Sequence, residues 1–219
     1  MEHKNAGKIN NVVIYGDSIS TRNHGNGGYE GLIKEKLKIN KIYNHAVGSS
    51  GISRTTPNIL ISLLEDEGNI HKEADLIIIW HGTNDWYWGA PLGHMRSNDE
   101  NTFNGAVNAV IIKLRKCCPH AIILFLTPIF RYETPDKCFL KEEGYVNKNF
   151  VNLTLKDYYD AIIDTSIILG FSTIDMRRLT NFHYYNAENY FEDYVHPCKA
   201  GYKEIAQVIA SNIDLLSFE

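Results

Sequence analysis

A serine, an asparagine and an Asp–His pair suit acyl-transfer chemistry by their residue types and positions. Ser18 follows a short apolar segment and a glycine, where a turn can present its hydroxyl and its backbone N–H to a ligand. Asn84 follows another apolar segment and offers an amide donor, which can stabilise an oxyanion without carrying a charge. Asp193 precedes His196 in a short turn-like segment, so its carboxylate can accept the Nδ1–H and leave Nε2 free as a base.

Each of these motifs also has an ordinary structural explanation. Ser18 and its neighbour Asp17 could form a turn or cap a helix, and Asn84 could form an Asx turn. Asp193 could be a surface carboxylate and His196 a capping residue. The three motifs together favour chemistry, because each lies at the end of an expected strand or the start of an expected helix.

Apolar runs alternate with segments of helical periodicity along the chain. This alternation predicts crossover connections, a mostly parallel sheet and helices on both of its faces. The long segments 82–102 and 128–149 each follow a strand, where ligands bind in open α/β sheets. We expect a single domain over residues 1–219, with strands at 11–16, 42–47, 74–80, 121–126 and 172–175 and helices at 28–39, behind Pro57, and at 103–114, 150–169 and 199–213.

Composition narrows the class of protein and of partner. The 219 residues are 44% hydrophobic and carry a formal charge of −4, which argues against a nucleic-acid binder. No apolar run is long enough for a membrane span, and the N-terminus lacks a signal-peptide stretch, so we expect a cytoplasmic protein. The nine histidines show no HExxH spacing, and we expect no metal.

Three sequence blocks resemble the motifs of the SGNH (GDSL-type) hydrolase family. The resemblance implies a flavodoxin-like three-layer α/β/α sandwich with about five parallel strands. It also implies a serine ester hydrolase that needs no cofactor, with Ser18 as nucleophile, His196 as general base and Asp193 as its orienting partner. The blocks are Gly16-Asp17-Ser18, Gly82-Thr83-Asn84-Asp85 and Asp193-Tyr194-Val195-His196-Pro197.

The resemblance further implies an oxyanion hole, in which one donor remains open. Ser18 would contribute its backbone N–H and Asn84 its side chain. The segment 44–51 resembles the loop that supplies the third donor, but Ser49 stands at the usual glycine position with Gly48 before it. A backbone donor does not require glycine, so either Gly48 or Ser49 could fill this role. Ile19 replaces the leucine of the family motif, a near-isosteric change.

The expected substrate is a small-molecule ester. Because no long apolar lid helix is evident, we favour a small acyl group over a long-chain lipid, with an O-acetyl group on a carbohydrate as the first candidate. Asp17, Trp86 and Tyr194 are the expected substrate contacts, and aromatic rings such as Trp86 can stack on sugars. The oligomeric state is left open.

Two other classes of protein compete with the enzyme. The first is a catalytically silent module that binds a carbohydrate or another ligand on the same fold. The second is a nucleotide-binding flavodoxin-like protein, for which Gly25-Asn26-Gly27-Gly28 would be the phosphate loop. That loop lacks the GxGxxG spacing and lies several residues after the strand, so it is a weak phosphate signal. The intact set Ser18, Asn84, Asp193 and His196 favours the enzyme.

Overall fold

A five-stranded parallel sheet forms the centre of the protein. The computed structural model describes residues 9–133, 145 and 147–216. Its strands have the spatial order β2-β1-β3-β4-β5, and all four neighbouring pairs are parallel, so the predicted sheet is confirmed. The strands are β1 (Asn11–Gly16), β2 (Lys41–Asn44), β3 (Leu76–Trp80), β4 (Ile122–Leu126) and β5 (Ser172–Ile174).

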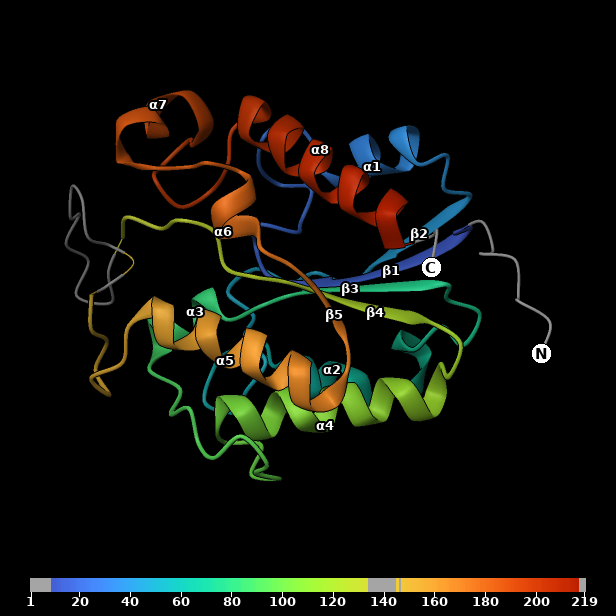
Figure 1. Ribbon diagram of the computed structural model, residues 1–219, viewed down its shortest axis with the longest axis vertical. Helices are drawn as coiled ribbons and strands as arrows, with labels where there is room; N and C mark the ends of the chain where they lie inside the picture. Colours follow the sequence, from blue (N-terminus) through green and yellow to red (C-terminus); the bar gives the residue numbers. More distant parts are fainter. Residues whose placement is uncertain (1–8, 134–144, 146, 217–219) are drawn as a thin grey trace.

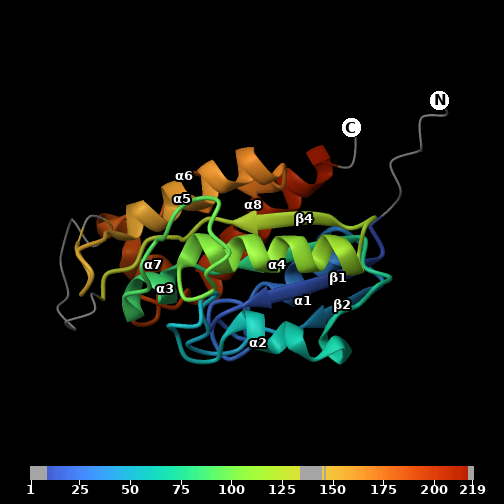
Figure 2. The ribbon, with the colours of Figure 1, turned by 90° about the horizontal axis from the view of Figure 1, so that it is seen from below.

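Helices cover both faces of the sheet and complete the predicted three layers. On one face lie α1 (Glu30–Lys36), α6 (Met176–Leu179), α7 (Ala187–Tyr190) and α8 (Lys199–Leu216), as Figure 1 shows. On the other lie α2 (Leu60–Glu65), α3 (Thr83–Trp88), α4 (Phe103–Cys117) and α5 (Leu155–Leu169), which Figure 2 views from below. Two short 3-10 helices, η1 (Glu67–Asn69) and η3 (Tyr184–Asn186), lie in the connections.

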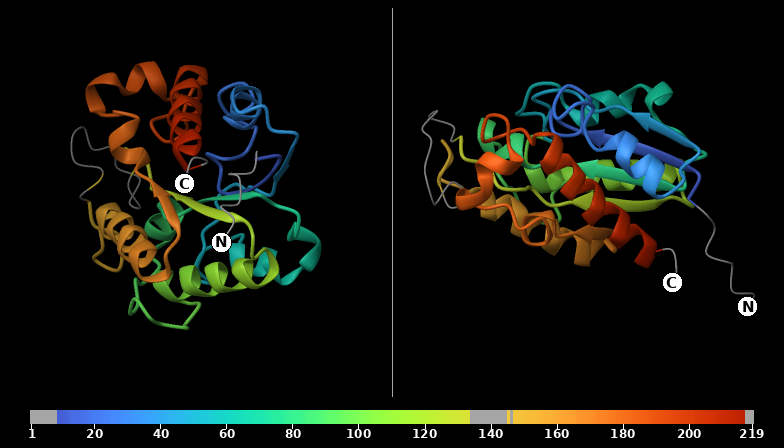
Figure 3. Two further views of the ribbon diagram at one scale, coloured as in Figure 1. Left: turned by 45° about the vertical axis from the view of Figure 1, so that its right-hand side comes forward. Right: turned by 90° about the horizontal axis from the view of Figure 1, so that it is seen from above.

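Alternation along the strands divides the apolar core into two halves. In β1, Val13 packs with the α2, α4 and α5 side, whereas Val12 and Ile14 pack with the α1 and α8 side. The central strand β3 is buried along its whole length, as expected for a parallel strand covered on both faces. Figure 3 shows α1 and α8 lying over the sheet from above.

Several helix boundaries differ from the predictions for local reasons. Helix α1 begins at Glu30 rather than residue 28, because Gly27 and Gly28 have positive φ angles that no α-helix contains. Helix α5 begins at Leu155 rather than 150, since Thr154 and Asp157 form a capping box there. The segment 82–102, expected to be a loop, begins with α3. Part of the segment 128–149 lies outside the described residues.

The connections leave a crevice at the carboxyl ends of β1 and β3. Strand β1 leads into α1 on one face of the sheet, and β3 leads through α3 to α4 on the other (Figure 1). Neighbouring strands whose connections leave in opposite directions define the position where ligands bind in open α/β sheets. Within the described residues, no helix has the length and apolar character needed to cross a membrane.

Candidate active site

Ser18 lies in a tight turn at the carboxyl end of β1. Gly16 ends the strand, and a Cβ atom there would lie 2.4 Å from the Ser20 hydroxyl oxygen, so only glycine fits. Asp17 holds the turn, since its carbonyl accepts from the Ser20 N–H at 3.0 Å and its carboxylate accepts from the Ile19 N–H at 2.9 Å. The chain therefore places Ser18 at the edge of the crevice.

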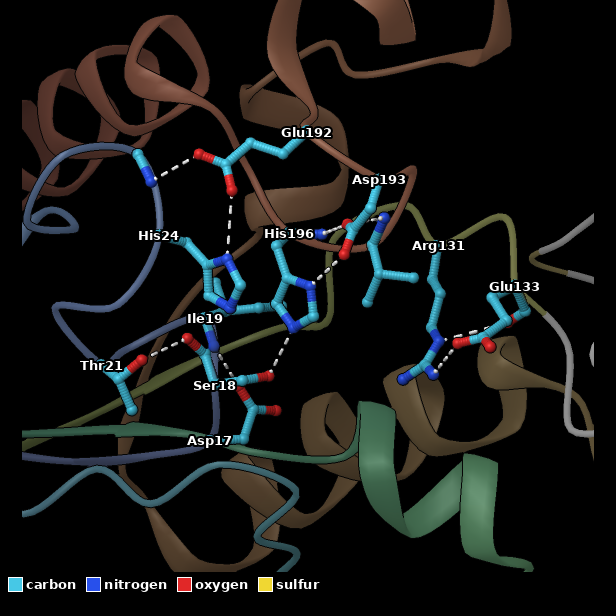
Figure 4. Close-up of polar contacts among 12 residues, drawn as sticks. Asp17, Ser18, Ile19, Thr21, His24, Arg131, Glu133, Glu192, Asp193 and His196 are labelled. Carbon is cyan, nitrogen blue, oxygen red and sulfur yellow. Dashed lines mark hydrogen bonds and ion pairs between the residues drawn. The ribbon is translucent and has the colours of Figure 1, made fainter.

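The imidazole of His196 lies between Ser18 and Asp193 (Figure 4). Its Nε2 is 2.9 Å from the Ser18 hydroxyl oxygen, and its Nδ1 is 2.7 Å from Oδ2 of Asp193. The other carboxylate oxygen accepts from the backbone N–H groups of His196 at 2.7 Å and Val195 at 3.0 Å. Burial alone would raise the pKa of Asp193, but these hydrogen bonds and the nearby imidazole lower it overall. Asp193 is thus ionised beside the imidazole at neutral pH.

Asn84 is held in the first turn of α3 by three polar partners. It follows Gly82, whose φ of 114° disfavours any residue with a side chain. The Asn84 amide donates to the Ser50 carbonyl at 3.0 Å and, at 3.4 Å, to the Asp17 carboxylate. Its oxygen accepts from the Arg131 guanidinium at 3.4 Å. The orientation of the amide is therefore fixed, with Nδ2 on the side of Asp17.

Asp85 positions the loop that precedes α2. Its fully buried carboxylate accepts from the backbone N–H groups of Ile52 at 3.1 Å and Ser53 at 3.0 Å. Burial raises the pKa of Asp85, although these two bonds oppose the rise. In the same loop, Ser49 has a φ of 61° and lines the pocket beside Ser18. The Gly48 carbonyl instead accepts from the Asn58 side chain at 2.9 Å.

A pocket of about 420 Å³ opens next to the Ser18 hydroxyl. Arg131 in its wall is 7% exposed, and its guanidinium forms an ion pair with Glu133 at 2.9 Å and lies 4.3 Å over the Tyr87 ring. Within the described residues, no group of three or more His, Cys, Asp or Glu side chains could hold a metal ion. The lining residues are Ser18, Ser49, Asn84, Tyr87, Trp88, Arg131, Glu133, Asp193, Val195 and His196.

None of the three predicted substrate contacts lines this pocket. Trp86 is fully buried in the core, because the helical turn of α3 directs it inward while Tyr87 and Trp88 line the pocket. Tyr194 packs its ring against Tyr132, with centroids 5.5 Å apart, and does not line the pocket.

Asp17, the third of these residues, is a buried structural acceptor. It is 2% exposed and does not line the pocket. Burial raises the pKa of Asp17 to about 7, although the Ile19 N–H and the nearby Arg131 oppose the rise. It therefore supports the turn and the Asn84 amide rather than a substrate.

Two residues beside His196 have no motif that could have revealed them. The His24 ring stacks on the His196 ring, and the Glu192 carboxylate lies 3.1 Å from Nδ1 of His24. These partners are 168 positions apart in the sequence, so only the tertiary structure brings them together. By contrast, Asp85 follows β3 and Arg131 follows β4. Their positions after the carboxyl ends of these strands are the signal that could have identified them.

Comparisons with known proteins agree on the family and the fold. The GDSL-like lipase/acylhydrolase family matches residues 14–204. A search of curated proteins gave no significant match.

Three solved structures illustrate the similarity in fold. A protein from Lactobacillus plantarum is 22% identical, with a TM-score of 0.82 over 95% of this chain and 98% of that one. A possible lipase from Chitinophaga pinensis is 22% identical, with a TM-score of 0.73 over 95% and 99%. The acetyl xylan esterase AlAXEase is 23% identical, with a TM-score of 0.66 over 93% and 99%.

The family match spans the segments that carry Ser18, Asn84 and His196, and the parallel α/β/α fold is the one that these solved structures share. The chain therefore belongs to the GDSL-like lipase/acylhydrolase family and is an ester hydrolase.

Proposed function

We propose that this protein hydrolyses carboxylic esters through an acyl-enzyme on Ser18. His196 Nε2 takes the hydroxyl proton as Ser18 Oγ attacks the carbonyl carbon, and Asp193 stabilises the imidazolium that forms. The imidazolium then protonates the leaving alcohol as the ester C–O bond breaks. Water, deprotonated by His196, then attacks the acyl carbon. As the bond from this carbon to Ser18 Oγ breaks, the imidazolium returns its proton to Oγ, which releases the carboxylic acid and restores the Ser18 hydroxyl and the neutral imidazole.

Three donors would stabilise the oxyanion of each tetrahedral intermediate. They are the backbone N–H groups of Ser18 and Ser49 and the side-chain amide of Asn84. Ser49 is favoured over Gly48 because Ser49 lines the pocket. The long 3.4 Å contact from Asn84 to the Asp17 carboxylate is the one the amide can exchange for the oxyanion, while its bond to the Ser50 carbonyl is kept.

The pocket favours a small acyl group on a polar alcohol. Most of its lining side chains are polar or charged, and the Arg131–Glu133 pair can bind hydroxyl groups. Trp88 is 48% exposed, so its indole offers a face on which a sugar ring can stack. A long acyl chain would instead need an extended apolar channel. The similar fold of AlAXEase, named an acetyl xylan esterase, is consistent with an O-acetylated carbohydrate substrate.

The observation that carries the proposal is the distance of 2.9 Å between Ser18 Oγ and His196 Nε2. A fluorophosphonate probe should label the wild-type protein at Ser18, identified by peptide mass spectrometry, and should not label Ser18→Ala. The same variant should lose hydrolysis of p-nitrophenyl acetate to background. Labelling at another residue, or full activity of Ser18→Ala, would contradict the nucleophile assignment and favour a silent binding module.

Substrate class is tested by comparing acyl groups and alcohols. We expect kcat/KM to fall steadily from p-nitrophenyl acetate to the long-chain esters, and acetate to be released from acetylated xylo-oligosaccharides. Trp88→Ala should raise KM for the oligosaccharide more than for p-nitrophenyl acetate, because only the sugar would stack on the indole. A preference for long acyl chains would contradict the small-acyl proposal and leave the serine mechanism intact.

A further inference from the structure

A second histidine–carboxylate pair lies against the catalytic one. The rings of His24 and His196 are stacked, with centroids 3.9 Å apart and planes 7° apart. Glu192 holds the outer ring, since its Oε2 lies 3.1 Å from Nδ1 of His24 and its Oε1 accepts from the Gly25 N–H at 2.8 Å. Figure 4 shows Glu192 and Asp193 each facing its own imidazole.

The segment that carries His196 needs such a support. Asp193 has a side chain 51% exposed and His196 one 20% exposed, so the pair lies near the surface rather than in the core. The bond from Nδ1 to Asp193 fixes one edge of the ring but leaves some freedom of rotation about the Cα–Cβ and Cβ–Cγ bonds of His196. A flat ring packed on one face removes this freedom, which keeps Nε2 directed at Ser18.

The His24 ring occupies that face without entering the pocket. It does not line the pocket beside Ser18, and its own nitrogen is engaged by Glu192. The hydrogen bond from the Gly25 N–H lowers the pKa of Glu192, and His24 lowers it further. The Glu192 carboxylate therefore remains charged. These contacts tie His24 to a fixed anchor outside the lining of the pocket.

We propose that His24 is a positioning residue for the general base: its ring, anchored by Glu192, holds the His196 imidazole in line with the Ser18 hydroxyl. This inference rests on the proposed serine mechanism. It assigns a role to ring shape and stacking, and this role differs from that of Asp193, which acts through a hydrogen bond and a charge.

Three substitutions at position 24 separate the ring from its hydrogen bond. His24→Phe keeps a flat ring and loses the bond to Glu192, His24→Asn keeps a donor and loses the ring, and His24→Ala loses both. We expect kcat for p-nitrophenyl acetate to fall about 3- to 10-fold in the Asn and Ala variants, because this fold-change corresponds to the stabilisation that one aromatic pair provides. KM should change less than about twofold. His24→Phe should lose less kcat than these two variants, because it keeps the stacked ring and loses only the anchor to Glu192. His120→Ala, at an exposed position on a turn, serves as the control.

Histidine-selective NMR provides a readout that needs no hydrolysis. The Nδ1–H proton of His196 should be slow to exchange in the wild type and in His24→Phe, and should broaden or exchange faster in His24→Asn and His24→Ala. Equal kcat and equal exchange in all variants would overturn the positioning role, as would a His24→Phe variant as impaired as His24→Ala. If the wild type fails to label at Ser18, the serine mechanism is wrong, whereas the NMR comparison still tests the stack.

Discussion

The two sides of the candidate active site are built in different ways. Asn84, on the oxyanion side, is 6% exposed and bound by partners from three separate segments of the chain. His196, on the base side, lies on a surface segment and is held by its neighbour Asp193 and by a stacked ring. The segment itself is closed by an isolated antiparallel bridge between Phe191 and Pro197.

The two sides therefore differ in what holds their side chains. Buried hydrogen bonds fix Asn84, whereas a hydrogen bond and a stacked ring near the surface hold His196. The proposed oxyanion donor Asn84 is built into the folded core, so its orientation would cost no reorganisation during the reaction. The proposed base His196 would gain and lose a proton in each half-reaction, and the half-exposed Asp193 carboxylate beside it would stabilise the charged imidazolium. We expect substitutions on the base side to affect rate with little loss of stability, and those on the oxyanion side to affect both.

The largest expected effect is on the base side. Asp193→Asn should lower kcat on the order of 10³- to 10⁴-fold, because the amide favours the wrong imidazole tautomer and no longer stabilises the imidazolium. Thermal unfolding should show little change in Tm, since the side chain is half exposed. A Tm drop comparable to that of a core substitution would show that this segment is a structural part of the fold.

Asn84→Ala should have the next largest effect. Loss of one oxyanion donor typically lowers kcat about 100- to 1,000-fold. The substitution also leaves the buried Ser50 carbonyl without its Asn84 donor, so the free energy of unfolding should fall by about 1–3 kcal/mol. Activity and denaturant unfolding measured on the same preparation would test both effects. An unchanged kcat would remove Asn84 from the oxyanion hole.

On the oxyanion side, His81 should make the stability of the fold sensitive to acid. His81 is 1% exposed, its Nδ1 lies 3.3 Å from the Ser50 carbonyl, and burial lowers its pKa to about 4. The unfolded chain takes up this proton below about pH 6.5, whereas the folded chain does so only near 4. Stability should therefore fall as the pH drops through this window, by up to about 3 kcal/mol.

The test is the difference in unfolding free energy between the wild type and His81→Asn, measured from pH 7 to 4.5. The difference is needed because Asp17, with its pKa raised by burial to about 7, contributes in the opposite direction as the pH falls. A difference that does not vary with pH would contradict the neutral, buried state of His81.

Ser49→Gly should have the smallest effect. The backbone N–H is kept, and glycine adopts the observed φ of 61° more readily than serine, so kcat should stay within about threefold and Tm should hold or rise slightly. Steady-state kinetics and thermal unfolding are the measurements. A large loss of kcat would indicate that the Ser49 side chain, rather than its backbone, contributes to the reaction.

The sequence alone was sufficient for the strand and helix alternation and for the motif residues. Apolar runs such as the one ending in Trp80 and the stripe of α4 are local patterns, and the period of each pattern follows from backbone geometry. Ser18, Asn84 and His196 follow strands or precede a helix, and in a parallel sheet those positions meet at one edge. That is why the fold, and the closeness of these candidate residues in space, could be predicted.

Only the tertiary structure decided which side chains form the pocket and its support. The inward direction of Trp86 and the outward direction of Trp88 depend on where α3 begins, which helical periodicity over so short a segment does not fix. The contact of His24 with His196 joins segments at opposite ends of the chain. Such contacts depend on packing between distant segments, and no pattern of neighbouring residues encodes that packing.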